Sequence, residues 1–179
     1  PLDPDRIPLD DPEPYRMLGR GESEGVFQFE SSMATDICCR MQPDRFEDLI
    51  AVNALIRPGP LDTGMTERYI NRKKGTEAVD AYHPDLEEIL GDTYGVITYQ
   101  EQVMQIAHRL AGFSLAEADV LRKAMGKKIQ ALIDEQLGRF REGALERGYP
   151  ASVVERLVGD IATFGRYGFN KSHSAAYAL

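Results

Sequence analysis

Apolar residues recur at helical spacing along most of the chain. The clearest case lies between residues 100 and 111, where Val103, Ile106 and Leu110 share one face of a helix that Gly112 ends. The same spacing recurs in both halves of the sequence. It predicts helices over residues 31–41, 44–57, 62–74, 100–111, 114–126, 128–147 and 150–164, and the start of another at 174–179.

Residues that begin or end helices stand at the boundaries of these segments. Ser114, with Glu117 three residues later, forms a capping box. Pro150 suits the first turn of a helix, and the Arg-Pro-Gly-Pro run at 57–60 stops the helix that precedes it. The boundaries therefore support the helices that the apolar spacing predicts.

Two short segments alternate apolar and polar side chains instead. Residues 25–30 predict a short strand, and residues 94–99 predict either a second strand or the entry to the next helix. Residues 1–14 hold five prolines among aspartates, which predicts an extended linker. The expected fold class is mainly α, with several helices and one or two short β segments.

The charge of the chain is uneven. The net charge is −8, but residues 1–100 hold 10 basic and 20 acidic side chains, whereas residues 101–179 hold 11 basic and 9 acidic ones. An acidic chain does not predict tight DNA binding on its own, because phosphates are neutralised by Lys and Arg. A locally positive cleft in the second half is compatible with this balance.

Several classes of site and location are disfavoured by the sequence. Cys38 and Cys39 are adjacent, which does not suit an ordinary disulfide, and His83, His108 and His173 lack metal-ligand spacing. We find no Walker loop, Rossmann fingerprint or Ser-His-Asp pattern, and therefore expect no catalytic residue and no metal site here. Without an apolar span or signal peptide, we expect no membrane partner and a cytoplasmic location. The pattern stops inside a predicted helix, so we also expect a piece of a longer protein.

A cationic block lies where two predicted helices meet. Arg122, Lys123, Lys127 and Lys128 fall within seven residues around Gly126. Guanidinium and ammonium groups at such a corner can grip a polyphosphate. The alternative is that these side chains are solvated and only favour the C-terminal end of their helix.

A second polar block precedes the last helix start. Asn170, Lys171, Ser172 and His173 follow Gly168, and Asn170 or Ser172 can cap the helix. The N-terminus of a helix attracts anions, so this block suits a phosphate. The alternative is an ordinary capped helix whose Lys and His side chains are solvated.

Other polar side chains are weaker candidates for contacts to a sugar, a base edge or a phosphate. Arg57 is held at a rigid corner, where it can bind a phosphate or pair with a carboxylate. Gln100 and Gln102 lie in a predicted first helical turn, and Arg166 and Tyr167 adjoin the second polar block.

Five sequence blocks resemble one protein family. The blocks are GVFQFES at 25–31, RPGP at 57–60, TYGVITYQEQVMQIA at 93–107, LRKAMGKK at 121–128 and YGFNKSHSAAYAL at 167–179. Together they resemble the bacterial DNA polymerase III alpha subunits, the C-family replicative polymerases. The resemblance implies that residues 1–24 lead out of the polymerase palm as a linker and that residues 25–179 form the fingers region.

The resemblance also implies an activity. The family adds deoxynucleotides from their triphosphates to a primed DNA template, using two Mg²⁺ ions held by palm aspartates that lie upstream of this segment. The implied partners are primed DNA, deoxynucleoside triphosphates and the remaining palm and thumb of the polymerase. A sliding clamp and other replisome subunits would bind through regions outside this segment. By itself the segment is expected to be inactive.

Site roles follow from the same resemblance. Arg122 and Lys123 match paired basic residues that face the incoming triphosphate, although many family members carry two arginines there. Lys127 and Lys128 match neighbouring lysines, and residues 170–173 match a block beside the nucleotide pocket. Three alternatives stay open: an error-prone C-family polymerase in DNA repair, a non-catalytic nucleotide- or DNA-binding helical module, and a structural domain.

Overall fold

The computed structural model describes residues 7–179, and helices dominate them. The aspartate-proline stretch at residues 1–6, part of the predicted linker, lies outside the described residues. The elements are α1 Pro12–Gly19, α2 Ser32–Met41, α3 Phe46–Leu55, α4 Pro58–Asp62, α5 Met65–Lys73, η2 Pro84–Leu86, α6 Glu87–Leu90, η3 Gly91–Thr93, α7 Gln100–Ala111, α8 Leu115–Gly126, α9 Gln130–Glu146, α10 Ala151–Gly165 and α11 Lys171–Ala178. The mainly α prediction is confirmed.

The predicted strands are absent from residues 7–179. In the segment 25–30, Gly25 and Gln28 have φ of 76° and 69°, and turn hydrogen bonds run from the Phe29 N–H to the Val26 carbonyl. Alternation there reflects a turn that buries Phe29 and leaves Phe27 exposed. The β prediction is therefore wrong for this segment.

The second predicted strand fails for a different reason. Residues 96–99 are buried, but a side chain satisfies their backbone: Gln102 Oε1 accepts hydrogen bonds from the N–H groups of Thr98 at 2.8 Å and Tyr99 at 3.0 Å. No neighbouring strand is needed when one amide takes both donors. The segment is the entry to α7, which was the other prediction.

The extended linker expected over residues 1–14 ends earlier than predicted. Helix α1 begins at Pro12, and the Asp11 side chain caps it by accepting from the Glu13 N–H at 3.0 Å. Proline is tolerated in a first helical turn because the first N–H groups have no partner within the helix. The prolines were read as a linker, although Pro12 lies in the first turn of a helix.

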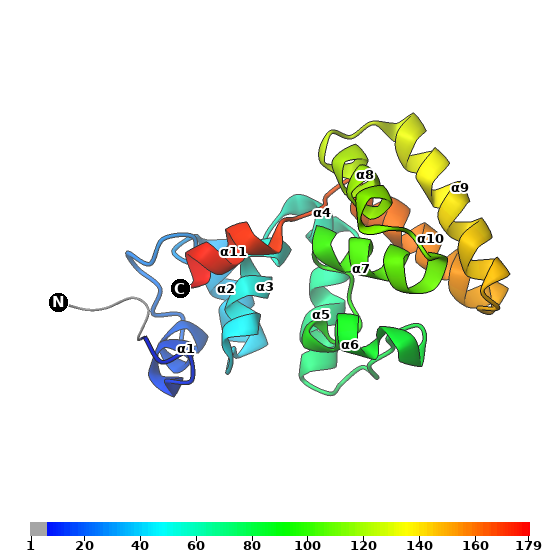
Figure 1. The fold of residues 1–179 in the computed structure, drawn as a ribbon. Helices are drawn as coiled ribbons and strands as arrows, with labels where there is room; N and C mark the ends of the chain where they lie inside the picture. Colours follow the sequence, from blue (N-terminus) through cyan, green and yellow to red (C-terminus); the bar gives the residue numbers. More distant parts are fainter. Residues whose placement is uncertain (1–6) are drawn as a thin grey trace.

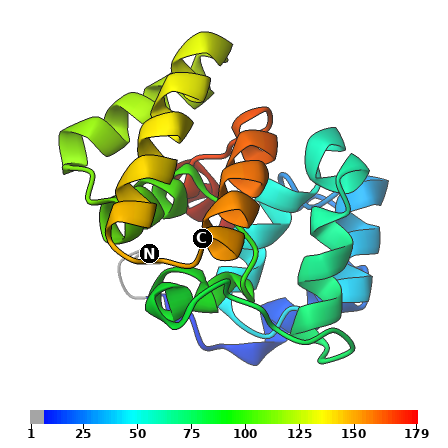
Figure 2. The ribbon, with the colours of Figure 1, turned by 90° about the vertical axis from the view of Figure 1, so that its right-hand side faces the viewer.

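The helices form two groups, each with its own apolar core. One core joins α1, α2, α3 and α5 through residues such as Tyr15, Ile37, Leu55 and Tyr69. The other joins α6 to α10 through residues such as Leu90, Ile106 and Leu121. Figures 1 and 2 show these two groups beside each other, with α11 returning from the second group to lie next to α3.

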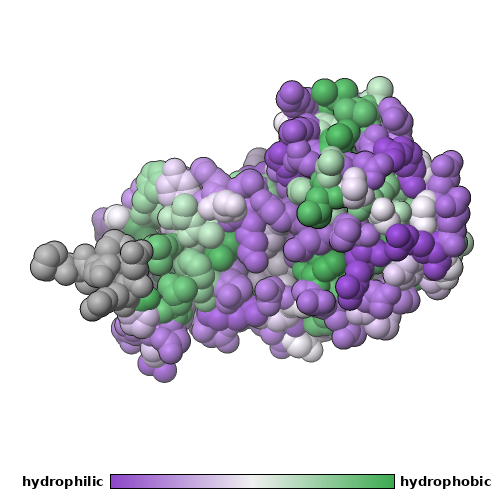
Figure 3. Space-filling view, viewed as in Figure 1, coloured by the Kyte–Doolittle hydropathy of each residue, from purple (hydrophilic) through white to green (hydrophobic). Residues whose placement is uncertain are grey.

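Helix α11 brings apolar side chains to the surface near its partner helix. Ser174 is buried and donates its hydroxyl to the Ile50 carbonyl of α3, which fixes α11 in place. Figure 3 shows apolar atoms gathered over this part of the molecule. Phe27 and Tyr177, whose rings lie 5.2 Å apart, are 61% and 42% exposed.

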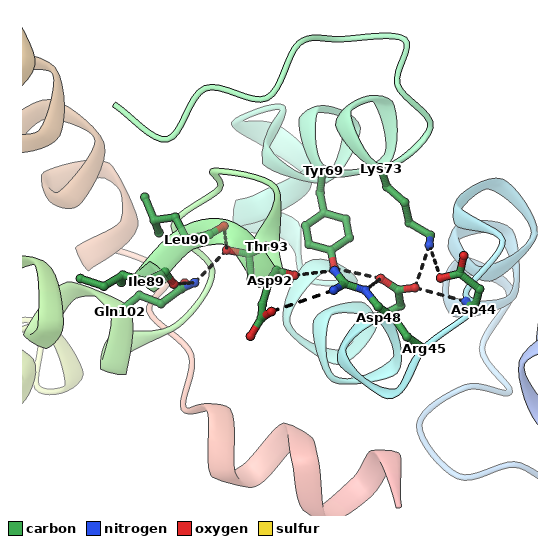
Figure 4. Close-up of polar contacts among 10 residues, drawn as sticks. All are labelled: Asp44, Arg45, Asp48, Tyr69, Lys73, Ile89, Leu90, Asp92, Thr93 and Gln102. Atoms are coloured by element: carbon green, nitrogen blue, oxygen red, sulfur yellow. Dashed lines mark hydrogen bonds and ion pairs between the residues drawn. The ribbon is translucent and has the colours of Figure 1, made fainter. Parts of the chain in front are cut away.

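A buried carboxylate links the first group of helices to the second (Figure 4). Asp48 of α3 is fully buried; Lys73 Nζ of α5 lies 2.8 Å from its Oδ2, and the Tyr69 hydroxyl donates to its Oδ1 at 3.2 Å. Arg45 also reaches Asp48 and donates to the Asp92 carbonyl of η3 at 2.8 Å. A charge is stable at such depth only when it is paired and hydrogen-bonded.

The pKa of Lys73 reflects this pairing. Burial lowers the pKa of its ammonium group, but the hydrogen bonds to Asp44 and Asp48 outweigh burial, so the pKa is raised. Lys73 therefore stays charged where α3 and α5 meet.

We expect Asp48→Ala to lower the free energy of unfolding by about 3 kcal/mol, because it leaves the Lys73 ammonium buried without its inner carboxylate. Urea denaturation measures this change. The matched control is Asp36→Ala, which removes an exposed carboxylate 3.4 Å from Arg40 and should cost less than about 1 kcal/mol. Equal losses in the two variants would contradict the role given to Asp48.

Helix α8 carries an acid-sensitive cap. The Ser114 N–H and hydroxyl and the Arg139 guanidinium bind the Glu117 carboxylate and lower its pKa to about 2. A lowered folded-state pKa stabilises the fold above the unfolded value, and this contribution is lost as pH falls.

We therefore expect the melting temperature of the chain to fall as the pH is lowered from about 4.5 to about 2, in part because Glu117 becomes protonated. Glu117→Gln should flatten that part of the profile, whereas Glu146→Gln, at an exposed position of α9, should leave it unchanged. Thermal unfolding followed by circular dichroism across this range measures both. Superimposable wild-type and Glu117→Gln profiles would exclude this role.

Candidate functional site

A cavity of about 410 Å³ forms where four distant parts of the sequence meet. Its walls come from the start of α4, the start of α7, the corner after α8 and the segment between α10 and α11. Figure 1 shows this last segment passing from the second group of helices to the first. We call it the basic groove. Five residues singled out in the sequence line it: Arg57, Gln100, Lys128, Arg166 and Tyr167.

The backbone at each wall explains why these side chains converge. Lys128 adopts a left-handed conformation with φ of 55°, which turns the chain sharply after α8. The Gln100 N–H donates to the Phe169 carbonyl at 2.9 Å and ties the start of α7 to the 165–170 segment. Gly59 packs directly against the Tyr167 ring: a Cβ at Gly59 would lie 2.0 Å from Tyr167 Cδ1. Only glycine permits this approach.

The groove is positively charged. It is lined by Arg57, Lys128 and Arg166, and no carboxylate is among its lining residues in the described part of the chain. Arg57 is held by a bond from its Nε to the Ala54 carbonyl at 3.1 Å, and its guanidinium lies 4.4 Å from the centre of the Phe169 ring. Burial lowers the pKa of Arg57, but a guanidinium remains charged at neutral pH. Preplaced cations of this kind attract phosphate groups.

Two residues of the first cationic block are engaged by an acid on their own helix. Arg122 Nε donates to Asp119 Oδ1 at 2.8 Å, and Lys123 Nζ lies 2.7 Å from Asp119 Oδ2. These bonds, from Lys123 and then Arg122, lower the pKa of Asp119. Arg122 and Lys123 lie outside the groove lining, one turn before Met125, which is part of it. Lys127 is exposed at the C-terminal cap of α8.

The second polar block is also paired with an acid. Asn170 caps α11 by accepting from the His173 N–H at 3.0 Å, while its Nδ2 donates to Glu101 Oε1 at 2.8 Å. The Lys171 N–H donates to the other Glu101 oxygen at 3.1 Å. The helix end predicted to face a phosphate thus faces a carboxylate of α7. Sequence reasoning missed Glu101, although it lies in the YQEQ run at 99–102.

The other residues of the second block point in different directions. Lys171 Nζ lies 5.5 Å from the centre of the Tyr99 ring, and Ser172 is exposed. His173 stacks edge-on against Phe169 and Tyr177, at 5.7 and 4.7 Å between ring centres.

His173 lines a second cavity, of about 210 Å³, which we call the amide pocket. Arg57 lines both cavities. The remaining lining residues of the amide pocket are Gln28, Asn53, Ile56, Phe169 and Tyr177.

Gln102 is separated from both cavities. Its side chain is buried, with Nε2 donating to Thr93 Oγ1 at 2.8 Å and to the Ile89 carbonyl at 3.2 Å (Figure 4). Its Nε2 thus donates two hydrogen bonds and its Oε1 accepts two from the backbone of residues 98 and 99, which uses both groups of the amide. Its observed contacts organise the entry to α7 and include no groove residue.

Two negative findings concern residues 7–179. They contain no group of three or more His, Cys, Asp or Glu side chains placed to hold a metal ion. None of their helices combines the length and apolar character that crossing a membrane requires.

We expect Gly59→Ala to lower the free energy of unfolding by about 1–3 kcal/mol, because the added methyl group would overlap the Tyr167 ring. The matched control is Gly159→Ala at an exposed position of α10, where nothing lies within 4 Å and helix propensity should add about 0.5–1 kcal/mol. Denaturant titration gives both values, and the NMR signals of the Tyr167 ring should shift only in Gly59→Ala. An unshifted ring there would refute the contact.

Comparison with known proteins confirms the resemblance found in the sequence. Residues 1–148 match the family model of the bacterial DNA polymerase III alpha subunit finger domain. The chain is 50% identical over 171 residues to DNA polymerase III subunit alpha of Aquifex aeolicus, covering 96% of this chain and 15% of that protein. It is 49% identical over 184 residues to the Escherichia coli K12 protein of the same name, covering 100% and 16%. The chain therefore spans only a small part of these relatives, and it belongs to the bacterial DNA polymerase III alpha subunit finger domain family.

Proposed function

We propose that this chain acts as the fingers region of a DNA-directed DNA polymerase and that its basic groove binds the triphosphate of the incoming deoxynucleotide. The observation that carries the proposal is the convergence of Arg57, Lys128 and Arg166 on one groove without a lining carboxylate. Four of the sequence blocks that resemble the family contribute residues to that groove, at 57–60, 93–107, 121–128 and 167–179. The relatives carry the name DNA polymerase III subunit alpha.

The groove would contribute charge and position to nucleotidyl transfer. During phosphoryl transfer, negative charge is spread over the non-bridging oxygens, and cations fixed in advance stabilise it without covalent chemistry. The two Mg²⁺ ions of this reaction would be held by palm aspartates of a longer polymerase polypeptide, since no metal-binding cluster occurs among residues 7–179. The residues of this chain would bind and orient the triphosphate.

Arg122 and Lys123, outside the groove, would add further contacts to the triphosphate. In the structure both pair with the single carboxylate of Asp119, at 2.7 Å in each case, so the cluster keeps a net positive charge. A triphosphate carries more charge than one carboxylate, so these side chains would exchange Asp119 for phosphate oxygens when the nucleotide binds. Lys127, exposed at the same corner, would join them.

The residues 170–173 would bind the nucleotide from the other side. Glu101 holds Asn170 and the Lys171 N–H in place, which orders the helix end before a substrate arrives. Ser172 and His173 are exposed on α11, Lys171 would leave the Tyr99 ring to reach a phosphate, and Gln100 and Tyr167 line the groove.

The chain would work together with primed DNA and the rest of the polymerase. The exposed apolar side chains Phe27, Tyr177 and Leu179 suit contact with other parts of a polymerase polypeptide, such as the palm. Main replicase and error-prone repair polymerase are both compatible with these features.

We expect the double variant Lys128→Ala with Arg166→Ala, in a polymerase polypeptide carrying these 179 residues as its fingers, to raise KM for the triphosphate at least tenfold. Each charge-assisted hydrogen bond contributes about 1.5–3 kcal/mol, and about 1.4 kcal/mol corresponds to a factor of ten. The double variant Arg122→Ala with Lys123→Ala should also raise KM for the triphosphate. Single-nucleotide incorporation on a primed template with Mg²⁺ provides KM and kcat separately.

The control variant Lys74→Ala with Arg141→Ala also removes one lysine and one arginine, but neither residue lines the groove. It should leave KM within about twofold, and the 179-residue chain by itself should incorporate nothing. Unchanged KM in both groove variants would reject the phosphate role. Tight, salt-sensitive DNA binding by the chain alone would instead favour a free-standing binding module.

A further inference from the structure

The amide pocket contains a polar side chain that the protein leaves unsatisfied. Asn53, on α3, is only 7% exposed, and neither its Nδ2 nor its Oδ1 has a hydrogen-bond partner among the described residues. In the described region, no other buried side-chain nitrogen or oxygen atom lacks a hydrogen-bond partner. An unpaired buried amide is costly, by about 1–3 kcal/mol, so its presence at a cavity points to a ligand that supplies both partners.

The walls of the amide pocket identify the chemistry of that ligand. Asn53 and Gln28 offer paired donor and acceptor atoms, the pattern that reads the edge of a nucleobase. Phe169, His173 and Tyr177 offer aromatic faces and edges against which a base can stack. A heterocyclic base with hydrogen-bonding edges matches both features.

Charge distinguishes a strand from a free triphosphate. Arg57 is the only residue with a permanent cationic side chain among those lining the amide pocket, and its terminal nitrogens make no hydrogen bond or ion pair within residues 7–179. One guanidinium matches the single charge of one phosphodiester, whereas the basic groove on the other side of Arg57 adds two further cationic side chains, Lys128 and Arg166. The amide pocket is therefore suited to one nucleotide unit of a strand.

We propose that the amide pocket binds an unpaired base of the single-stranded template, with Asn53 hydrogen-bonding to the base edge and Arg57 contacting its phosphodiester. The proposal rests on the assignment of this chain to a polymerase fingers region. The base would provide the donor and acceptor that Asn53 lacks and would lie against Phe169 and Tyr177. Asn53 becomes a template-positioning residue, separate from the triphosphate contacts.

The test uses the polymerase polypeptide carrying these residues, with no triphosphate present. Primed templates carry 2-aminopurine at one unpaired template position at a time, and both its fluorescence and the binding affinity are measured. We expect wild type to change the fluorescence at one position. Asn53→Leu should abolish most of that change and weaken binding of overhang templates at least threefold relative to blunt duplex.

Folding is controlled separately. Asn53→Leu replaces an unpaired amide by an apolar group of similar size, so its melting temperature should equal or exceed that of wild type. The smaller Asn53→Ala serves as the second variant if leucine does not fit. Gln136→Leu removes an equally buried amide from α9, remote from the amide pocket, and should bind templates as wild type does.

Two results would overturn the proposal. Unchanged fluorescence and overhang affinity in both Asn53 variants would mean that an internal water alone satisfies the amide. Unchanged fluorescence together with a raised KM for the triphosphate would assign the amide pocket to the incoming nucleotide. Because the fluorescence is read without triphosphate, failure of the Lys128 and Arg166 variants to change KM would reject the proposed groove function without deciding this one.

Discussion

The Asp48 carboxylate is the interaction on which the arrangement of the helices depends. It is fully buried, and it is compensated by Lys73 of α5, by the Tyr69 hydroxyl and by Arg45, which also reaches η3. Apolar packing fixes which faces of α3 and α5 meet, but it tolerates sliding. A buried charge does not, because displacement by an ångström or two leaves it unpaired at a cost of several kcal/mol. Asp48 therefore sets the registration of α3 against α5 and η3.

Both candidate cavities depend on that registration through α3. The C-terminal half of this helix carries Asn53 and leads directly into Arg57, which lines the basic groove and the amide pocket. Helix α11 packs against α3, where the Ser174 hydroxyl donates to the Ile50 carbonyl. This packing brings His173 to the amide pocket. Shifting α3 would thus move residues of both cavities together. The polar cluster around Asp48 acts on the site without touching it.

The sequence predicted α2, α3, α5 and α7 to α11 because their signals are local, but it missed α1, α4 and α6 and began the helix of α5 at residue 62 instead of Met65. Capping residues, prolines and apolar spacing act within one or two turns, so Ser114 with Glu117 marks α8 correctly and Gly112 ends α7. The two β predictions failed where local contacts that alternation does not reveal decide the backbone: the Gln102 amide, in the capping box of α7, satisfies Thr98 and Tyr99, and Gln28 adopts a left-handed turn. Pairing across the fold is likewise invisible in sequence. Neither the orphaned amide of Asn53 nor the Glu101 contact with α11 could be inferred from spacing.

The acidic residues explain how a chain with a net charge of −8 can present cations to a phosphate. Asp119 holds Arg122 and Lys123, and Glu101 holds the start of α11, so each proposed phosphate-binding element outside the groove already has a carboxylate partner. Such partners keep the cations ordered in the absence of substrate. They also lower the net gain on binding, because phosphate contacts to Arg122 and Lys123 would return the carboxylate that they share, Asp119, to water. The affinity then depends on how much more strongly the cations interact with phosphate than with carboxylate. A ligand with several clustered charges is favoured over one with a single charge, and in the proposed function this would distinguish a triphosphate from the phosphodiesters of a strand.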